Sequence, residues 1–230
     1  MTWGEGVYMV LDELKLVSDD STFEEEHIIF LMNKYRARIL RQNYASGKKT
    51  VLDDNYQTIE VPLKEVNAID GIYDRRKYLK STAEIPSLLG IGNTVVSTVD
   101  YYQGNIVFVP REKMRTTGHN KWLKNIIYAS LNDGSLYLKS ENPQFLYLGS
   151  VKLTGIFDDA KEATLLTGDT NILDMKFPLE GSFINAMIQL IVQELSGAVY
   201  KPEDNINNSA DDLADIGISS SKNRQTKNEE

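Results

Sequence analysis

The stretch from Phe23 to Tyr44, FEEEHIIFLMNKYRARILRQNY, decides the fold, because it is predicted to form a long helix and is followed by a part of the chain predicted to form strands. Its acidic residues occupy the first turns and its basic residues the later turns, an order that complements the helix dipole. The sequence SGKKT at 46–50 ends it, with Gly47 as the predicted C-terminal cap. The helix spacing predicts a buried stripe of Ile28, Leu31, Met32, Tyr35, Ile39 and Leu40.

The residues before this helix predict another helix and a break. Thr2 and Glu5 have the spacing of a capping box, in which each side chain binds the free backbone N–H of the other residue. Apolar residues then recur every three or four positions up to Val17. The sequence SDDST at 18–22 breaks this pattern, and Ser21 or Thr22 is the expected N-cap of the second helix.

A third helix is predicted near the other end of the chain, in PLEGSFINAMIQLIVQELSGAVY at 178–200. Pro178 is expected just inside its start. Pro202 ends it near Tyr200, because a proline disfavours helical backbone at the residue before it. Its apolar stripe comprises Ile184, Met187, Ile188, Ile191, Val192, Leu195 and Val199.

The middle of the chain changes to short runs of β-branched and aromatic residues between turn residues. A strand is predicted in YQTIEVPL at 56–63, and a hairpin in 94–110 with its turn at 103–105. A second hairpin, in 125–140, turns at Asp133-Gly134, a strong hairpin dipeptide. The segment 143–157 adds one or two strands. Strand ends or edges are expected at Pro62, Pro110 and Pro143.

These patterns predict an α+β fold. Three helices from the two ends of the chain form a small base, and an inserted antiparallel β-rich lobe projects from it. The expected units are a helical pair at 1–49, the β-rich lobe at 50–170, the C-terminal helix at 171–201 and an extended tail at 202–230.

Composition limits the classes of function. The chain has 33 acidic and 25 basic residues, a formal charge of −8, which argues against a free-standing binder of duplex DNA. An acidic chain is compatible with lining a path along which DNA slides without sticking. There is no cysteine, and no apolar run is long enough to cross a membrane, so no disulfide and no membrane partner are expected. The start lacks the basic segment of a signal peptide, which predicts synthesis in a cytoplasm-like compartment.

Motifs for catalysis are sparse, and no catalytic, cofactor-binding or metal-binding residue is predicted. Glu24 and His27 have the Glu-x-x-His spacing of carboxylate metal sites, but such a site needs a second copy of the motif. His119 lies in a polar stretch and is expected to be structural. A metal-dependent enzyme using Glu24 and His27 is therefore the least favoured hypothesis.

Two basic clusters, at 73–80 and 111–115, are candidates for contact with a neighbouring subunit or with DNA. In the first cluster, tyrosines alternate with basic residues as in a nucleic-acid platform. The alternative interpretation is a loop whose basic side chains contact acidic side chains of a neighbouring subunit. The candidate residues are Arg75, Arg76, Lys77, Arg111 and Arg115.

The C-terminal tail has too few apolar residues to offset the entropy of ordering, about 1–2 kcal/mol per residue. Between 203 and 215 it carries five acids and no base. We therefore expect it to be ordered by docking on a partner, with acids around a few apolar anchors. The predicted docking residues are Glu203, Asp204, Asp211, Asp212, Leu213, Asp215, Ile216 and Ile218.

Over about residues 2–215 the chain resembles a virion structural protein of crAss-like phages, short-tailed phages of gut bacteria. The resemblance lies in the opening TWGEGVYMVLDELKLV, in HNKWLKNIIYASL at 119–131, in VKLTGIF at 151–157 and in QELSGAVYKPEDNINNSADDLA at 193–214. It implies a ring or adaptor protein of the head-to-tail connector beneath the portal. It also implies a homo-oligomeric, typically twelve-fold ring around the channel used by the genome.

Two hypotheses from different classes therefore lead. The first is a non-enzymatic connector ring whose partners are itself, the portal protein, other connector or tail proteins and the DNA that passes through it. It predicts residence in the virion. The alternative is a tail-associated binding module, in which an aromatic β-rich lobe recognises a glycan or a receptor.

Overall fold

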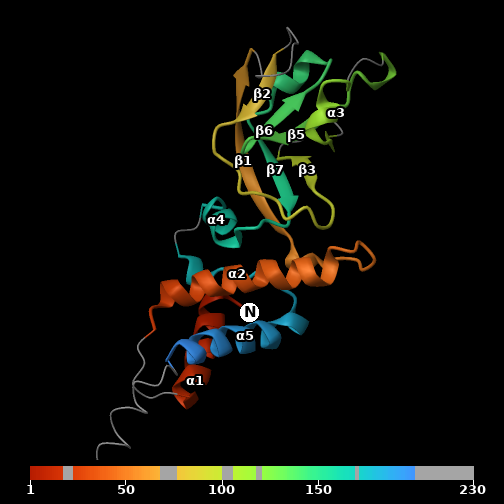
Figure 1. The fold of residues 1–230 in the computed structure, drawn as a ribbon. Coiled ribbons are helices and arrows are strands. Elements are labelled where there is room, and N and C mark those ends of the chain that lie inside the picture. Colours follow the sequence, from red (N-terminus) through yellow and green to blue (C-terminus); the bar gives the residue numbers. More distant parts are fainter. Residues whose placement is uncertain (18–22, 68–76, 100–105, 118–120, 169–170, 200–230) are drawn as a thin grey trace, which may run out of the picture.

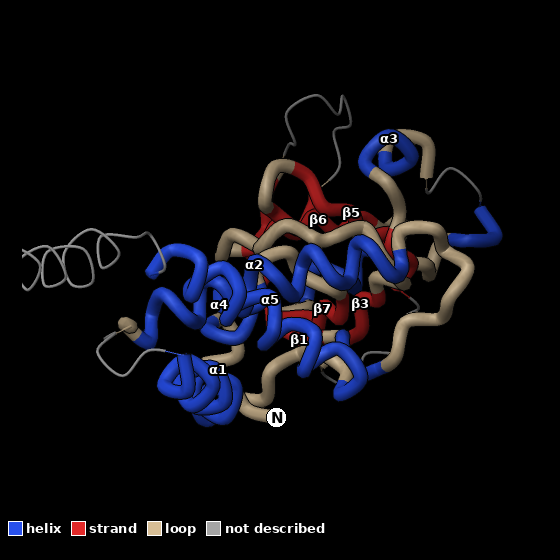
Figure 2. The backbone as a smooth tube through the Cα atoms, turned by 60° about the horizontal axis from the view of Figure 1, so that its bottom comes forward, coloured by secondary structure: helices blue, strands red, loops and turns tan. Residues whose placement is uncertain are grey.

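The protein consists of a helical base and a β lobe that stands on it (Figure 1). The computed structural model describes residues 1–17, 23–67, 77–99, 106–117, 121–168 and 171–199. Both ends of the described chain lie in the base, and the lobe is formed by the residues between them (Figures 1 and 2). The α+β architecture predicted from the sequence is confirmed.

The base is built from α1 (Trp3–Val17), α2 (Glu25–Tyr44) and α5 (Gly181–Val199). Helices α2 and α5 run antiparallel, because Tyr44 contacts Glu180 at one end and Lys34 contacts Glu194 towards the other. The predicted stripes face one another across this layer. Its core includes Trp3, Val10, Ile28, Leu31, Met32, Leu40, Met187, Ile188, Ile191 and Leu195.

The lobe is a seven-stranded sheet in the order β3-β7-β1-β2-β6-β5-β4, antiparallel except for the parallel pair β4–β5. The two outermost strands, β3 and β4, pack beside each other, so the sheet curls around its own core. The strands are β1 (Gln57–Val66), β2 (Tyr78–Ser81), β3 (Val95–Thr98), β4 (Ile106–Phe108), β5 (Ile127–Asn132), β6 (Ser135–Lys139) and β7 (Ser150–Gly155).

Two of the strand predictions have different outcomes. The hairpin at Asp133-Gly134 is confirmed: both residues have positive φ, 50° and 66°, and they join β5 to β6. The hairpin expected within 94–110 is not formed by the described strands, because β3 pairs with β7 and β4 pairs with β5. Its expected turn lies outside the described residues.

Pro62 lies inside β1 rather than at a strand end. Strand β1 pairs with β7 up to Pro62, opposite Ser150, and with β2 from Leu63, opposite Ser81. A proline lacks the N–H that a continuous ladder needs, so it fits the position where a strand changes partner. This change of partner bends β1 and lets one strand connect both halves of the curled sheet.

Short helices complete the fold. Helix α4 (Ala160–Leu165) lies between the lobe and α2 (Figure 1), with Ala160 in the core of the base and Ala163 in the core of the lobe. On the lobe, α3 (Arg111–Met114) packs on β5. The 3-10 turns are η1 (Asp53–Asn55), η2 (Lys121–Leu123), η3 (Pro143–Tyr147) and η4 (Ile172–Asp174).

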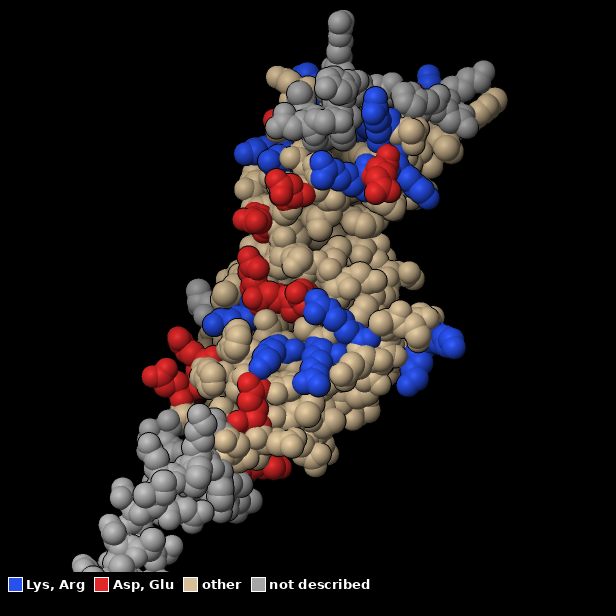
Figure 3. Space-filling model, viewed as in Figure 1, with Lys and Arg blue, Asp and Glu red and all other residues tan. Residues whose placement is uncertain are grey.

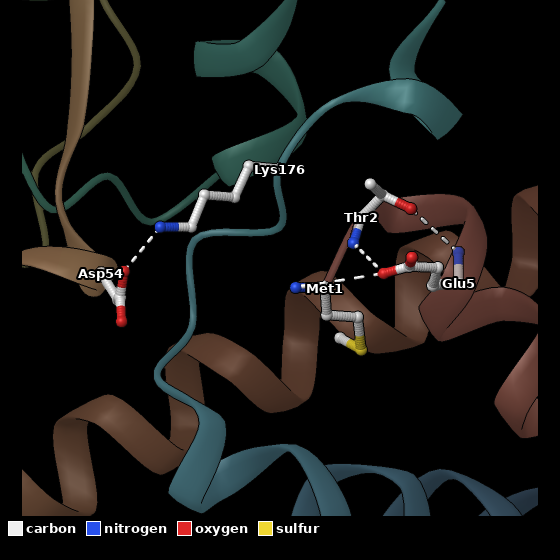
Figure 4. A network of polar contacts seen from close by, with 5 residues as sticks. All are labelled: Met1, Thr2, Glu5, Asp54 and Lys176. Carbon is white, nitrogen blue, oxygen red and sulfur yellow. Dashed lines mark hydrogen bonds and ion pairs between the residues drawn. The ribbon is translucent and has the colours of Figure 1, made fainter.

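The capping box at the start of α1 is confirmed (Figure 4). Thr2 N donates to Glu5 Oε2 at 2.8 Å, and Glu5 N donates to Thr2 Oγ1 at 3.1 Å. The segment before α5 then holds this end of the chain, since Trp3 N donates to Met175 O and Phe177 N donates to Met1 O, each at 3.0 Å. These bonds lock the first helix onto the last part of the chain.

Two predicted helix starts are wrong. Helix α2 begins at Glu25, with Glu24 as an N-cap whose side chain makes no capping bond, while Ser21 and Thr22 lie outside the described residues. Helix α5 begins at Gly181, three residues after Pro178. Pro178 lies in a bend before the helix instead, and its carbonyl accepts a hydrogen bond from Arg36.

Candidate subunit-contact surface

Arg36 joins the base to the lobe from inside the protein. It lies on α2 and is 0% exposed. Its guanidinium donates to three backbone carbonyls: Nε to Pro178 at 2.7 Å, Nη1 to Phe157 at 2.8 Å and Nη2 to Asn55 at 3.3 Å. These carbonyls belong to the segment before α5, the exit from β7 and the entry to β1. One side chain therefore binds three of the segments that run between the base and the lobe.

Glu180 is a second buried charge at the same joint. It accepts hydrogen bonds from Tyr44 Oη at 2.6 Å, from Asn55 Nδ2 at 3.0 Å and from the Ser182 hydroxyl. Its own backbone N–H donates to Asn55 Oδ1 at 3.1 Å. Asn55 thus binds both charged residues, through its backbone to Arg36 and through its side chain to Glu180. Buried charges are tolerated when they are hydrogen-bonded in this way.

Both groups at the joint are charged at neutral pH, although burial acts against the charge of each. Burial lowers the pKa of Arg36 to about 10, while the carboxylates of Asp158 and Asp159 act in the opposite direction. Burial alone would raise the pKa of Glu180, but the hydrogen bonds from Ser182, Tyr44 and Asn55 lower it below its ordinary value. Burial and the bond to Glu180 raise the pKa of Tyr44 to about 12.

Lys176 adds a surface contact on the same joint. Its Nζ lies 2.5 Å from Asp54 Oδ1, which ties the segment before α5 to η1 at the entry of the lobe (Figure 4). The hydrogen bond to Lys176 lowers the pKa of Asp54. With Arg36 and Glu180, this contact gives the two parts of the molecule a fixed relative orientation.

The outward face of α2 is available for contact with other molecules. Phe30 is 61% exposed there, and Lys34, Arg38 and Arg41 follow along the same helix. Lys34 pairs with Glu194 of α5 at 2.9 Å, and Arg41 pairs with Asp158 at 2.9 Å. Hydrogen bonds from Tyr35 and Lys34 lower the pKa of Glu194. These pairs tie α2 to its neighbours but leave Arg38 unpaired among the described residues.

Charge is separated along α2 (Figure 3). Lysine and arginine gather over its middle and C-terminal part and the loop beyond, and acids gather over its N-terminal end. We call Arg38, Arg41, Lys48 and Lys49 the basic end, and Glu24, Glu25 and Glu26 the acidic end; all seven are exposed. At about 1.5 Å per residue, Glu25 and Arg41 lie about 24 Å apart along α2.

The basic residues singled out in the lobe and described by the structure lie on different elements. Lys77 lies just before β2, where it pairs with Glu65 of β1 at 2.6 Å. It lines an open groove of about 370 Å³ together with Glu141, Phe145 and Leu146. Arg111 and Arg115 lie in and just after α3, exposed, on the β5 side of the lobe. Arg75 and Arg76 lie outside the described residues, as does the whole predicted docking tail from Glu203 to Ile218.

The structure sorts the aromatic residues of the lobe, which the sequence could not do. Phe145 and Tyr128 are buried. Trp122 of η2 and Tyr147 of η3 are 82% and 89% exposed. The segments after η2 and before η3 are joined, because Asn142 N donates to Lys124 O at 3.2 Å. An exposed aromatic surface of this kind suits contact with another macromolecule.

Glu24 and His27 are both exposed at the start of α2, and the ring of His27 stacks on that of Phe30 at 6.5 Å. Among the described residues, no three or more histidine or acidic side chains gather as they would to hold a metal ion. In that same part of the chain no helix has the length and apolarity to cross a membrane.

Comparison with known proteins agrees with a virion component. The family described as phage tail ring protein 2 matches residues 5–213 of the chain. A relative from Bacteroides phage crAss001, named ring protein 2, is 46% identical over 223 residues. That match covers 94% of this chain and 99% of the relative. The similarity therefore includes the base, the lobe and part of the sequence that follows α5.

Proposed function

Because the chain belongs to the phage tail ring protein 2 family, we propose that it is a ring of the head-to-tail connector beneath the portal. The chain is a phage ring protein and a structural component of the virion. We propose further that twelve copies of it surround the channel through which the genome is packaged, retained and ejected. The protein acts through assembly and not through catalysis.

The observation that carries this proposal is the fixed joint between base and lobe. A ring closes only if every subunit presents its contact faces at the same angle to the next. Arg36 binds three crossing segments, and Glu180 binds three side chains at the same place. A subunit that is rigid at this joint transmits one geometry around the whole ring.

The charge of the chain fits a DNA channel. A net charge of −8 disfavours tight, lasting contact with phosphates. Basic residues such as Arg111 and Arg115 are exposed singly on a small helix and not in a continuous groove. We propose that these residues, with Arg75, Arg76 and Lys77, contact neighbouring subunits or the passing DNA without reading its sequence.

The sequence after α5 is proposed to bind another virion protein. It follows the last helix of the base and carries five acidic and no basic residues between 203 and 215. We propose that Leu213, Ile216 and Ile218 anchor it on the portal or the next ring, while the acids around them set its position. In this role it joins tiers of the connector that the folded part does not reach.

A second function is favoured by one observation, the exposure of Trp122 and Tyr147. A tail-associated module could present these two aromatics to a glycan or a receptor. Saturable glycan binding by the full chain, lost in Trp122→Ala and Tyr147→Ala, would support this alternative. Retained infectivity in both variants would argue against it.

The connector proposal is tested by copy number and by truncation. Quantitative mass spectrometry of purified virions should find this chain in a fixed ratio to the portal protein, and a ratio of one fits twelve copies of each. A chain ending at residue 202 should still fold, with an unchanged thermal transition, but should fail to join particles. Normal incorporation of the truncated chain into infectious virions would refute the role given to the tail.

A further inference from the structure

We propose that neighbouring subunits of the ring meet head to tail through α2, with the basic end of one copy against the acidic end of the next. This inference rests on the proposed function, because it names the contact that closes the ring. The occupant of the basic end is therefore a second copy of this chain.

A cyclic ring requires two different, complementary faces on each subunit. In a cyclic oligomer with more than two copies, each subunit uses two different faces, and one face must complement the other. Helix α2, which is roughly 30 Å long, carries the acidic end at its start, and its last turns with the loop that follows carry the basic end. A surface with one charge sign at both ends would repel its own copy.

The two ends are free to take new partners. Three of the four residues of the basic end, Arg38, Lys48 and Lys49, make no ion pair with any described residue, whereas the fourth, Arg41, is paired with Asp158. The side chains of Glu24, Glu25 and Glu26 likewise make no ion pair within the described chain. Exposed pairs add little affinity individually, but complementary charge sets the register of two surfaces and rejects wrong ones.

Each end also presents an apolar residue. Phe30 is 61% exposed one turn after the acidic end, and Leu52 is 54% exposed three residues after Lys49. Apolar side chains surrounded by polar groups are the usual anchors of a protein interface. The charge pairs would then form the rim around these two anchors.

DNA is the competing occupant of the basic end. A duplex would be drawn to Arg38, Arg41, Lys48 and Lys49 equally well, whereas it would avoid the acidic end. The two occupants differ in one respect: a subunit contact needs the acidic end, and a DNA contact does not. The test therefore manipulates both ends.

Crosslinking locates the contact in assembled virions. The chain has no native cysteine, so Glu25→Cys with Lys49→Cys places one reactive thiol at each end. A short bis-maleimide cannot join these two thiols within one subunit, because position 25 is at the start of α2 and position 49 lies beyond its end. It should instead give a ladder of covalent oligomers up to the closed ring, while either cysteine alone gives no ladder. A ring of confirmed copy number without a ladder from the double variant would overturn this contact and leave the connector role intact.

Charge reversal tests whether the two ends meet. Lys48→Glu with Lys49→Glu, or Glu25→Lys with Glu26→Lys, should lower incorporation into particles about tenfold or more, because like charges then face each other. All four changes together should restore incorporation to within about threefold of wild type. Lys124→Glu with Lys152→Glu, at exposed sites on the lobe, is the matched control and should have no effect.

The failures are distinguishable. Loss in the basic-end variant without rescue by the acidic-end change identifies DNA or another acidic partner and rejects the head-to-tail contact. Full incorporation of both one-end variants also rejects it. If the copy number in virions is too low for any ring, the proposed function itself fails.

Discussion

Arg36 Nε donates a hydrogen bond to the carbonyl of Pro178 at 2.7 Å, although 142 residues separate them in the chain. The bond connects the second helix to the segment that begins the last one. The same guanidinium reaches the entry and the exit of the β lobe. One buried side chain therefore ties both connections of the lobe to the segment before α5.

Replacing Arg36 by methionine should destabilise the protein by about 3–5 kcal/mol, because three buried carbonyls lose their partner. Arg38→Met on the exposed face of the same helix is the control and should change stability by less than about 0.5 kcal/mol. Chemical denaturation of the purified chain measures both. Equal effects in the two variants would show that the joint does not depend on Arg36.

The helices could be predicted from the sequence because their signals are local. The apolar spacing of α1, α2 and α5, the capping box at Thr2 and the Asp133-Gly134 turn each depend on residues within a few positions. The joint could not be predicted in this way. In the sequence Arg36 is one of several basic residues in the later turns of a helix, and its burial involves contacts with Phe157 and Pro178, 121 and 142 residues away.

The same reason explains the errors in the strands. Strand β4 pairs in parallel with β5, and β3 pairs with β7, which follows it by more than 50 residues. Alternation of apolar residues shows that a segment is a strand but does not name its partner. The sequence of α2 already places acidic residues in its first turns and basic residues in its later turns. Only the structure shows that the charged side chains at both ends of the helix are exposed.

Glu180 should make the protein sensitive to acid. Its pKa is lowered in the folded state, so its contribution to stability is present above the ordinary pKa of a glutamate and is lost as pH falls through the folded value. Glu180→Gln should therefore lose less stability than wild type on acidification below about pH 4.5, although it starts from a lower value at neutral pH. Denaturation curves recorded from about pH 3 to about pH 7 measure the stability of the variant and of the wild type. Parallel acid limbs would exclude Glu180 as the group responsible.

Gly92 and Gly90 allow a matched test of the close approach between Tyr56 and the loop that contains both glycines. Both have φ of +70°, which disfavours any residue with a side chain. A Cβ on Gly92 would also clash with the hydroxyl of Tyr56, which accepts a hydrogen bond from Asn93 N at 3.2 Å, whereas a Cβ on Gly90 would meet open space.

Gly90→Ala should therefore cost about 1–2 kcal/mol, and Gly92→Ala should cost about 1–3 kcal/mol more. Thermal unfolding of the two variants, measured side by side, gives the difference. If the variants are equally stable, the close approach of Tyr56 does not hold in solution.

Thr2→Ala removes half of the capping box and should cost about 1 kcal/mol, because the backbone N–H of Glu5 loses its acceptor. Glu13→Ala, at an exposed position within the same helix, is the control and should stay within about 0.5 kcal/mol of wild type. Amide hydrogen exchange in the first turn of α1 provides a second readout. Unchanged protection there would show that the cap contributes nothing.

The measurement that tests the central claim most directly is a reconstruction of the intact virion at the portal vertex, calculated without imposed symmetry. The account predicts copies of this chain in one closed ring beneath the portal, with twelve-fold symmetry, and with α2 of each copy running from one neighbour to the next. Copies placed singly on the outside of the tail, away from the axis, would contradict it.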